Sequence, residues 1–110
     1  MSELAKKACI ACRGDVPSLK GKEIGIFLKK LGGKWRVVDE HHLEKEFKFK
    51  DWAEAMRFSN RVSEIAEREN HHPELTVGYG KVTVRIWTHK INGLFESDFI
   101  LAAKIDESFK

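Results

Sequence analysis

An apolar stripe in the middle of the chain limits the fold more than any other feature. Its members recur at helical spacing over about five turns and are Trp52, Ala55, Met56, Val62, Ile65 and Ala66. Asp51 can cap the start of such a helix, and Glu54 places an acid in its first turn. Pro73 cannot continue a helix and moves His72 out of the helical region of backbone space. The sequence therefore predicts a long helix that begins at Asp51 and ends near Asn70.

The segments on both sides of this helix alternate between apolar and polar residues, which is typical of strands. The predicted strands are 35–38, 43–49, 75–79 and 82–86, and a turn at 38–42 joins the first two. Further helices are predicted at 18–31, where Gly32 and Gly33 end the apolar periodicity, and at 97–109. Two hairpins that pair into one sheet are the economical packing. We therefore predict an α+β fold of order α-β-β-α-β-β-α, with a four-stranded antiparallel sheet and helices packed on one face.

Two details of the predicted strands bear on packing and assembly. Lys45 falls on the apolar side of its strand, beside Leu43 and Phe47, so we expect it near an edge of the sheet. The last strand directs Trp87 and His89 away from its aliphatic side. A sheet of four strands also has two outer edges, which can pair with a second copy. The sequence therefore predicts a homo-oligomer.

Length and charge exclude several classes of protein. A chain of 110 residues holds one domain with a single core, which we place at 18–110 after a flexible leader at 1–17. The net charge of +3 comes from lysines scattered along the chain, so nucleic acid is not an expected partner. No apolar run approaches the ~20 residues that span a bilayer, and the N-terminus lacks the apolar stretch of a signal peptide. We therefore expect a cytoplasmic protein with no membrane partner.

The leader contains both cysteines of the chain, Cys9 and Cys12, in a CxxC arrangement. A zinc site needs four ligands, and no second CxxC or CxxH pair accompanies this one. A redox site would need the pair at the start of a helix in a βαβ unit. We therefore expect reduced thiols in a loosely held segment, with a zinc ion shared between two subunits as the alternative.

Several titratable side chains fall close to the predicted end of the long helix. His71 and His72 end it, and Glu67 stands one turn before His71, where its carboxylate can reach that ring. His89 closes the last predicted strand, and Asp98 opens the final helix. If the second hairpin returns the last strand past the helix end, these five groups converge.

Two kinds of chemistry fit such a cluster. Imidazoles with carboxylates to orient them suit general acid–base catalysis. Two or three histidines with a carboxylate also suit zinc or iron. Each histidine taken alone is more often an exposed polar residue, and the spacing does not choose among these interpretations.

The arrangement of these residues resembles the signature of the pterin-4a-carbinolamine dehydratases. The matching positions are Glu67, His71, His72, Pro73, Tyr79, His89 and Asp98. The stretch FKFKDWAEAMRFSNRVSEIAE is similar to that family's long helix, and KVTVRIWTHKINGLFESDFILAAKID is similar to its closing strand, loop and helix. The resemblance covers roughly residues 18–107, and a spaced pattern over 32 residues is far more specific than a lone histidine pair.

The resemblance implies a specific reaction. Members of that family are hydro-lyases that remove water from 4a-hydroxytetrahydropterin, the product left when aromatic amino acid hydroxylases use their cofactor. The dehydrated product is quinonoid dihydropterin, and no metal or cofactor is needed. By resemblance, the catalytic residues are His71, His72 and His89, the orienting or tuning carboxylates are Glu67 and Asp98, and the pterin contacts are Pro73 and Trp87. The expected assembly is a homodimer or homotetramer.

Two further functions and one departure from the family pattern accompany the resemblance. A protein with this signature can act on another pterin, such as one related to the molybdenum cofactor, or serve as a non-enzymatic dimerisation cofactor and coactivator. Phe95 stands where the family commonly has Ser or Thr to cap the last helix. We therefore expect Ser97 or water to take over that bond, and Asp98 to sit slightly differently from its place in the family.

Overall fold

The computed structural model describes residues 18–109 and shows the predicted α+β architecture. The elements in chain order are α1 (Gly21–Leu31), β1 (Arg36–Val38), β2 (His42–Lys48), α2 (Trp52–Glu69), β3 (Glu74–Gly78), β4 (Lys81–Ile86), the 3₁₀ turn η2 (His89–Ile91) and α3 (Glu96–Phe109). The leader at 1–17 and its two cysteines lie outside the described residues, so what we expect of them stays a prediction.

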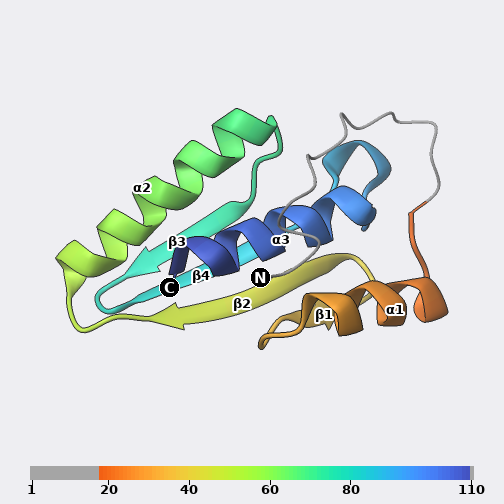
Figure 1. Cartoon of the computed structure of the whole chain (residues 1–110), viewed down its shortest axis with the longest axis horizontal. Helices are drawn as coiled ribbons and strands as arrows, with labels where there is room; N and C mark the ends of the chain where they lie inside the picture. The colour runs from red at the N-terminus through yellow and green to blue at the C-terminus, as the bar shows by residue number, and fades with distance from the viewer. Residues whose placement is uncertain (1–17, 110) are drawn as a thin grey trace.

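The strands form one four-stranded antiparallel sheet in the order β1-β2-β4-β3 (Figure 1). The two strands of each predicted hairpin pair with each other. The central strands β2 and β4 also pair and so join the two hairpins, with Leu43 opposite Ile86 and Phe47 opposite Val82. The described helices lie on one face of the sheet, where α3 contacts both α1 and α2 (Figure 1). The predicted fold class, with helices packed on one face of an antiparallel sheet, is therefore confirmed.

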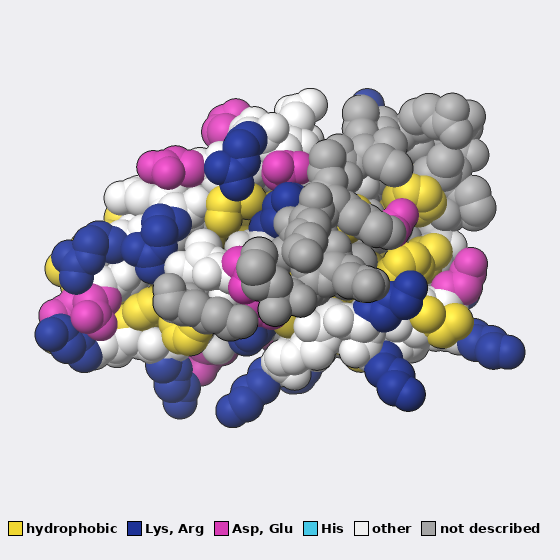
Figure 2. All heavy atoms as spheres, in the orientation of Figure 1, with side chains coloured by type: hydrophobic (Ala, Val, Ile, Leu, Met, Phe, Trp, Pro, Cys, Tyr) yellow, Lys and Arg dark blue, Asp and Glu magenta, His cyan; other side chains and the backbone are white. Residues whose placement is uncertain are grey.

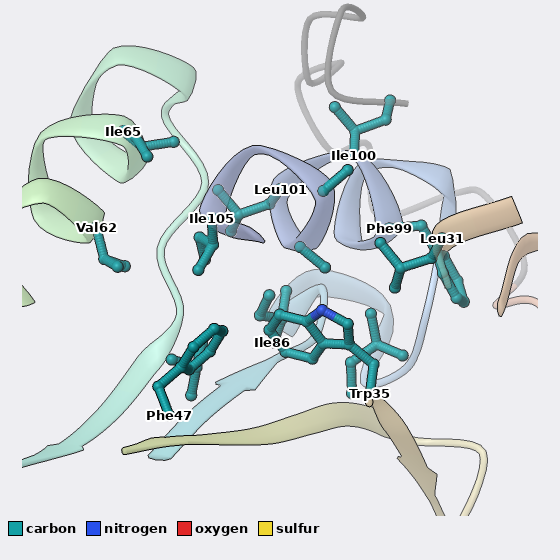
Figure 3. Packing of buried hydrophobic residues seen from close by; sticks show 14 of the residues in the cluster. Leu31, Trp35, Phe47, Val62, Ile65, Ile86, Phe99, Ile100, Leu101 and Ile105 are labelled. Carbon is teal, nitrogen blue, oxygen red and sulfur yellow. The ribbon is translucent and has the colours of Figure 1, made fainter. Parts of the chain in front are cut away.

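Alternation along the strands supplies the apolar inner face of the sheet. In β4, Val82 and Ile86 are fully buried, while the residues between them alternate in burial. Figure 3 shows Leu31 of α1, Val62 of α2 and Phe99 of α3 in the same layer as Ile86. Burying one such side chain stabilises the fold by about 1.5–3 kcal/mol. This layer therefore holds the helices, and with them the end of α2, in fixed positions over the sheet.

Both predicted ends of α2 are confirmed. Asp51 caps the first turn, its Oδ1 accepting from the Glu54 backbone N–H at 2.9 Å. At the other end Asn70 takes the left-handed conformation with a φ of 53°. The backbone N–H of His71 donates to the Ala66 carbonyl at 3.1 Å, which satisfies one of the last carbonyls of the helix. This motif also turns the chain sharply, so the backbone leaves the helix direction at His71.

Lys45 lies in the centre of the sheet, and the prediction of an edge position is wrong. Its strand, β2, is flanked by β1 and β4. The ammonium group donates to Asp106 Oδ1 at 2.7 Å and lies 4.7 Å from the centre of the Phe47 ring. The indole N–H of Trp35 donates to Asp106 Oδ2 at 2.9 Å. The Asp106 carboxylate on α3 therefore pairs with the Lys45 ammonium group, the charge that β2 places on its apolar side.

Charges of both signs are mixed on the face of the molecule that Figure 2 shows. On the face shown in Figure 2, Lys and Arg side chains stand at separate places with Asp and Glu among them. On the other side of the sheet, Glu44 bonds to both Arg36 and Arg85. Among the described residues, no helix is long and apolar enough to cross a membrane. Interspersed charges of this kind are typical of a solvated surface.

Candidate active site

A cleft of about 320 Å³ opens between the end of α2 and the segment that follows β4. Its lining residues are Asn70, His71, His72, Trp87, Thr88, His89 and Lys90. The fold thus brings the three singled-out histidines to one cleft, together with Trp87. Its volume lies at the lower end of the roughly 300–1,000 Å³ typical of small-molecule sites.

A buried carboxylate stands behind His71. Asp98 is wholly inaccessible to solvent, and its Oδ1 accepts from His71 Nε2 at 2.6 Å. The Thr88 hydroxyl and the backbone N–H of Phe95 both donate to Asp98 Oδ2 at 2.8 Å. These donors stabilise the ionised carboxylate without exposing it to water. Because Asp98 fixes the proton of His71 on Nε2, the nitrogen that can accept a proton is Nδ1.

Phe95 holds Asp98 in place through its backbone. Besides donating its N–H to the Asp98 side chain, it accepts from the Asp98 backbone N–H at 3.0 Å. The N–H that a Ser or Thr hydroxyl at position 95 would bind is therefore satisfied by a carbonyl. Asp98 is thus tied into the first turn of α3 although position 95 has no side-chain oxygen.

Glu67 pairs with His72, and the prediction that it reaches the His71 ring is wrong. Glu67 Oε2 lies 3.6 Å from His72 Nε2, and both side chains are largely exposed. The four-residue spacing brings two side chains together only while the chain stays helical. The left-handed Asn70 breaks that relation, so His71 turns to Asp98 on α3 while His72 stays beside α2. Within the described structure, Glu67 is not one of the residues lining the cleft.

His89 does not close the last strand as predicted. β4 ends before it, and His89 begins the η2 turn. A bridge between Thr88 and Gly93 and the left-handed Asn92 close this turn. The His89 ring packs against Trp87, with ring centres 4.5 Å apart. The turn thus presents an exposed imidazole beside a flat aromatic surface in the cleft.

Sequence reasoning missed Thr88, whose hydroxyl bonds to Asp98. Thr88 stands two residues after Ile86, on the inward side of the strand's alternation, and it is buried. A hydroxyl at such a position needs an interior partner, which is the signal that could have identified it. Pro73, which we expected to contact the pterin, is not among the cleft residues that the structure describes.

The metal interpretation requires several ligand groups around one point. Within residues 18–109, no three His, Cys, Asp or Glu side chains are placed to hold one ion. The cleft wall instead holds a histidine paired with one buried carboxylate, His71 with Asp98. An imidazole held by a carboxylate is an arrangement suited to proton transfer.

Comparison with known proteins places this chain in a family. The family profile described as Pterin 4 alpha carbinolamine dehydratase matches residues 17–108. A relative from Rubrobacter xylanophilus is 53% identical over 106 residues, which cover 96% of this chain and 98% of the relative. A relative from Alkaliphilus metalliredigens is 46% identical over 107 residues, which cover 97% of this chain and 96% of the relative. Both are named after pterin-4-alpha-carbinolamine dehydratase.

Solved structures share the fold. The crystal structure of a transcriptional coactivator/pterin dehydratase from Brucella melitensis is 34% identical, has a TM-score of 0.78, and covers 84% of this chain and 99% of its own. A pterin dehydratase-like RuBisCO assembly factor of the alpha-carboxysome is 21% identical, has a TM-score of 0.60, and covers 71% of this chain and 92% of its own. Its likeness concerns the fold alone. With the family profile and the two close relatives, these matches show that the chain belongs to the pterin-4-alpha-carbinolamine dehydratase family.

Proposed function

We propose that this protein dehydrates 4a-hydroxytetrahydropterin to quinonoid dihydropterin by histidine acid–base catalysis, and so recycles the cofactor of aromatic amino acid hydroxylases. The observation that carries the proposal is the buried Asp98 carboxylate behind His71, at the wall of a cleft that His72 and His89 also line. Membership of the dehydratase family supports the class of substrate.

The reaction needs two proton transfers. The C4a–O bond breaks as the departing hydroxyl takes a proton and leaves as water, and a C4a=N5 double bond forms as N5 gives up its proton. Imidazoles can donate or accept near neutral pH because their ordinary pKa is about 6.5. His71 suits the acceptor role, since Asp98 stabilises the imidazolium that forms when Nδ1 takes a proton. His72 and His89 are more exposed and suit the donor role, in which either can act.

Trp87 supplies the surface on which a flat bicyclic substrate would lie. Its ring lines the cleft beside the His89 ring, to which it is tilted by 35°. Stacking between aromatic planes orients a ring system while leaving its edge groups to polar side chains. We therefore place the pterin against Trp87, with its C4a and N5 atoms toward the histidines.

The test is the decay of synthetic 4a-hydroxytetrahydropterin, followed by absorbance in a stopped-flow instrument. We expect the protein to speed the decay at least ~100-fold over the buffer rate, because positioned acids and bases contribute about that much or more. A chelator should leave this rate unchanged. Activity that a chelator abolishes and zinc restores would instead support the metal interpretation.

A binding role is the second candidate function. The Brucella melitensis protein is described as both a transcriptional coactivator and a pterin dehydratase, and it is 34% identical to this chain. A folded protein that fails to dehydrate 4a-hydroxytetrahydropterin but binds another protein would support that role. Turnover of a different pterin, such as one related to the molybdenum cofactor, would keep the chemistry and change the substrate.

We also propose that the protein is a homodimer or homotetramer. Among the strands of residues 18–109, β1 and β3 are the outer ones, and outer strands of a sheet can pair with a second copy. Sedimentation at micromolar concentration should show a species at least twice the 12.7 kDa of one chain. A single species of 12.7 kDa would contradict this proposal.

A further inference from the structure

A second pair of histidines lies behind the cleft. His41 is the last residue of the turn between β1 and β2, His42 begins β2, and their Nδ1 atoms are 3.0 Å apart. The other nitrogen of His41, Nε2, bonds to the side-chain oxygen of Asn92 at 2.9 Å. Both rings pack against Trp87, with ring centres 5.1 Å away for His41 and 5.8 Å away for His42. Trp87 in turn packs against His89, at 4.5 Å.

These contacts touch both ends of the segment that carries His89. Trp87 stands at the start of this segment and Asn92 at its end, where a left-handed φ of 49° closes the η2 turn. Contacts at Trp87 and at Asn92 therefore keep the η2 turn between them in place. Neither His41 nor His42 is among the residues that line the cleft, so they act on it only through Trp87 and Asn92.

We propose that His41 and His42 are positioning residues, a histidine brace that holds Trp87 and the His89 turn in their active arrangement and releases them when both imidazoles are protonated on both nitrogens. The proposal rests on the proposed function of the cleft. It assigns to the reaction two residues on a different hairpin from the three histidines of the cleft.

Hydrogen-bond direction limits how many protons the brace can hold. The Asn92 carbonyl oxygen accepts, so His41 Nε2 donates and His41 Nδ1 is free to accept. His42 Nδ1 then donates to His41 Nδ1 and closes the chain. One extra proton on His42 Nε2 leaves this chain intact. A second proton, on His41 Nδ1, sets two N–H groups against each other at 3.0 Å and breaks the brace.

The surroundings oppose protonation of the brace. Burial is the main cause that lowers the pKa of His42 below its usual value, and positive charge on His41 lowers it next. Glu44 partly opposes this by raising the pKa, Arg85 on β4 lowers it, and Asp39 raises it least. Glu44 on β2 lies 3.9 Å from His42 Nε2, but its carboxylate is already bonded to Arg85 at 2.8 Å. The His89 ring also packs on Trp87, with ring centres 4.5 Å apart. The brace is therefore intact near neutral pH and opens only below about pH 6.5, the ordinary imidazole pKa.

The backbone that presents the brace is held firmly. Asp39 and Glu40 both have positive φ, 55° and 54°, in a turn closed by the His41 N–H, which donates to the Val38 carbonyl at 2.9 Å. Neither is glycine, and such a conformation persists only where neighbouring contacts enforce it. Glu40 Oε2 supplies one of these contacts by accepting from the Gly21 backbone N–H at 2.9 Å. A turn fixed in this way can resist movement of Trp87.

Spectra of the full-length protein labelled with ¹⁵N test the brace without substrate. The indole N–H signal of Trp87, identified by its loss in Trp87→Phe, should shift with a midpoint below pH 6.5. That shift should disappear in His41→Gln and in His42→Gln, which cannot titrate. It should persist in His89→Gln, the matched control for the other imidazole on the Trp87 ring. The signals of Trp35 and Trp52 should not follow the transition.

Kinetics test the positioning role. His41→Gln and His42→Gln should each lower kcat roughly ten- to a hundredfold, as small displacements of catalytic groups do, with KM changed less than kcat. Wild-type kcat in both variants, or a Trp87 transition that survives in both, would overturn the proposal. The spectra distinguish a failure of the brace proposal from a failure of the proposed function. A Trp87 transition that depends on His41 and His42, in a protein that dehydrates no pterin, would refute the function proposed for the cleft and not the brace.

Discussion

Asp98→Asn is expected to lower kcat for pterin dehydration by about 100- to 10,000-fold, although asparagine has almost the same shape. The Thr88 hydroxyl and the Phe95 N–H both donate to Oδ2, so the new amide should turn its oxygen to them and its NH₂ group to His71. His71 Nε2 must then accept, and its proton moves to Nδ1. The nitrogen assigned to take the substrate proton is thereby blocked.

The kinetics of Asp98→Asn, His71→Ala and the double variant measure this effect. Because the two residues act as one unit, the double variant should lose little more than the more damaging single change. Glu67→Gln is the matched control, since it alters another carboxylate beside a histidine, at 3.6 Å and largely exposed. It should cost less than about threefold. Losses that multiply in a folded double variant would show that Asp98 and His71 work independently.

Asp106→Ala is expected to destabilise the fold by about 2–3 kcal/mol, the largest effect on stability that we predict. The change leaves the Lys45 ammonium group and the Trp35 indole N–H without their carboxylate in the apolar layer. This value lies at or below the lower end of the roughly 3–5 kcal/mol for a broken buried pair, because the side chains of Lys45 and Asp106 keep 15% and 21% exposure. Urea unfolding followed by circular dichroism gives the free energy of unfolding.

A second variant distinguishes removal of the whole Lys45–Asp106 ion pair from removal of Asp106 alone, which leaves the Lys45 charge unpaired. Lys45→Met combined with Asp106→Asn removes both charges together, while the asparagine oxygen can still accept from Trp35. Its free energy of unfolding should lie within about 1 kcal/mol of the wild type. A double variant as unstable as Asp106→Ala would mean that shape, rather than an unpaired charge, sets the cost at this position.

Much of the fold follows from local signals in the sequence. The apolar stripe, the Asp51 cap and Pro73 predict α2 to within a residue at each end, since each acts on its own stretch of chain. Alternation predicts four strands, and two hairpins have few ways to pair. The position of Lys45 was predicted wrongly because alternation gives the face of a strand and not its place in the sheet.

The partners within the site depend on contacts that local patterns do not contain. Glu67 was predicted to reach His71 by helical spacing, but Asn70 ends the helix between them and His71 turns to Asp98. His89 was predicted to end a strand, yet the Thr88–Gly93 bridge folds it into a turn. The left-handed Asn70 and the Thr88–Gly93 bridge are local turns that apolar periodicity does not specify, whereas the His71–Asp98 contact depends on how distant elements pack.

The histidines at the start of β2 illustrate the same limit. The sequence predicts only a turn at 38–42, and nothing nearby in the chain indicates that His41 reaches Asn92, 51 positions later. The pairing of β2 with β4 brings the two segments together, because Leu43 stands opposite Ile86, beside His42 and Trp87. Residues that act through another side chain are therefore visible only once the sheet register is known.

The central claim is that the imidazoles of one cleft carry out the dehydration. The most direct measurement compares His71→Ala, His72→Ala and His89→Ala with the wild type, for turnover of 4a-hydroxytetrahydropterin and for binding of a stable pterin analogue. We expect kcat/KM to fall about 100-fold or more in His71→Ala and toward 100-fold in the other two, which can replace each other in part. The Kd of the analogue should change much less than the turnover. Wild-type turnover in all three variants, with the fold intact, would contradict the account.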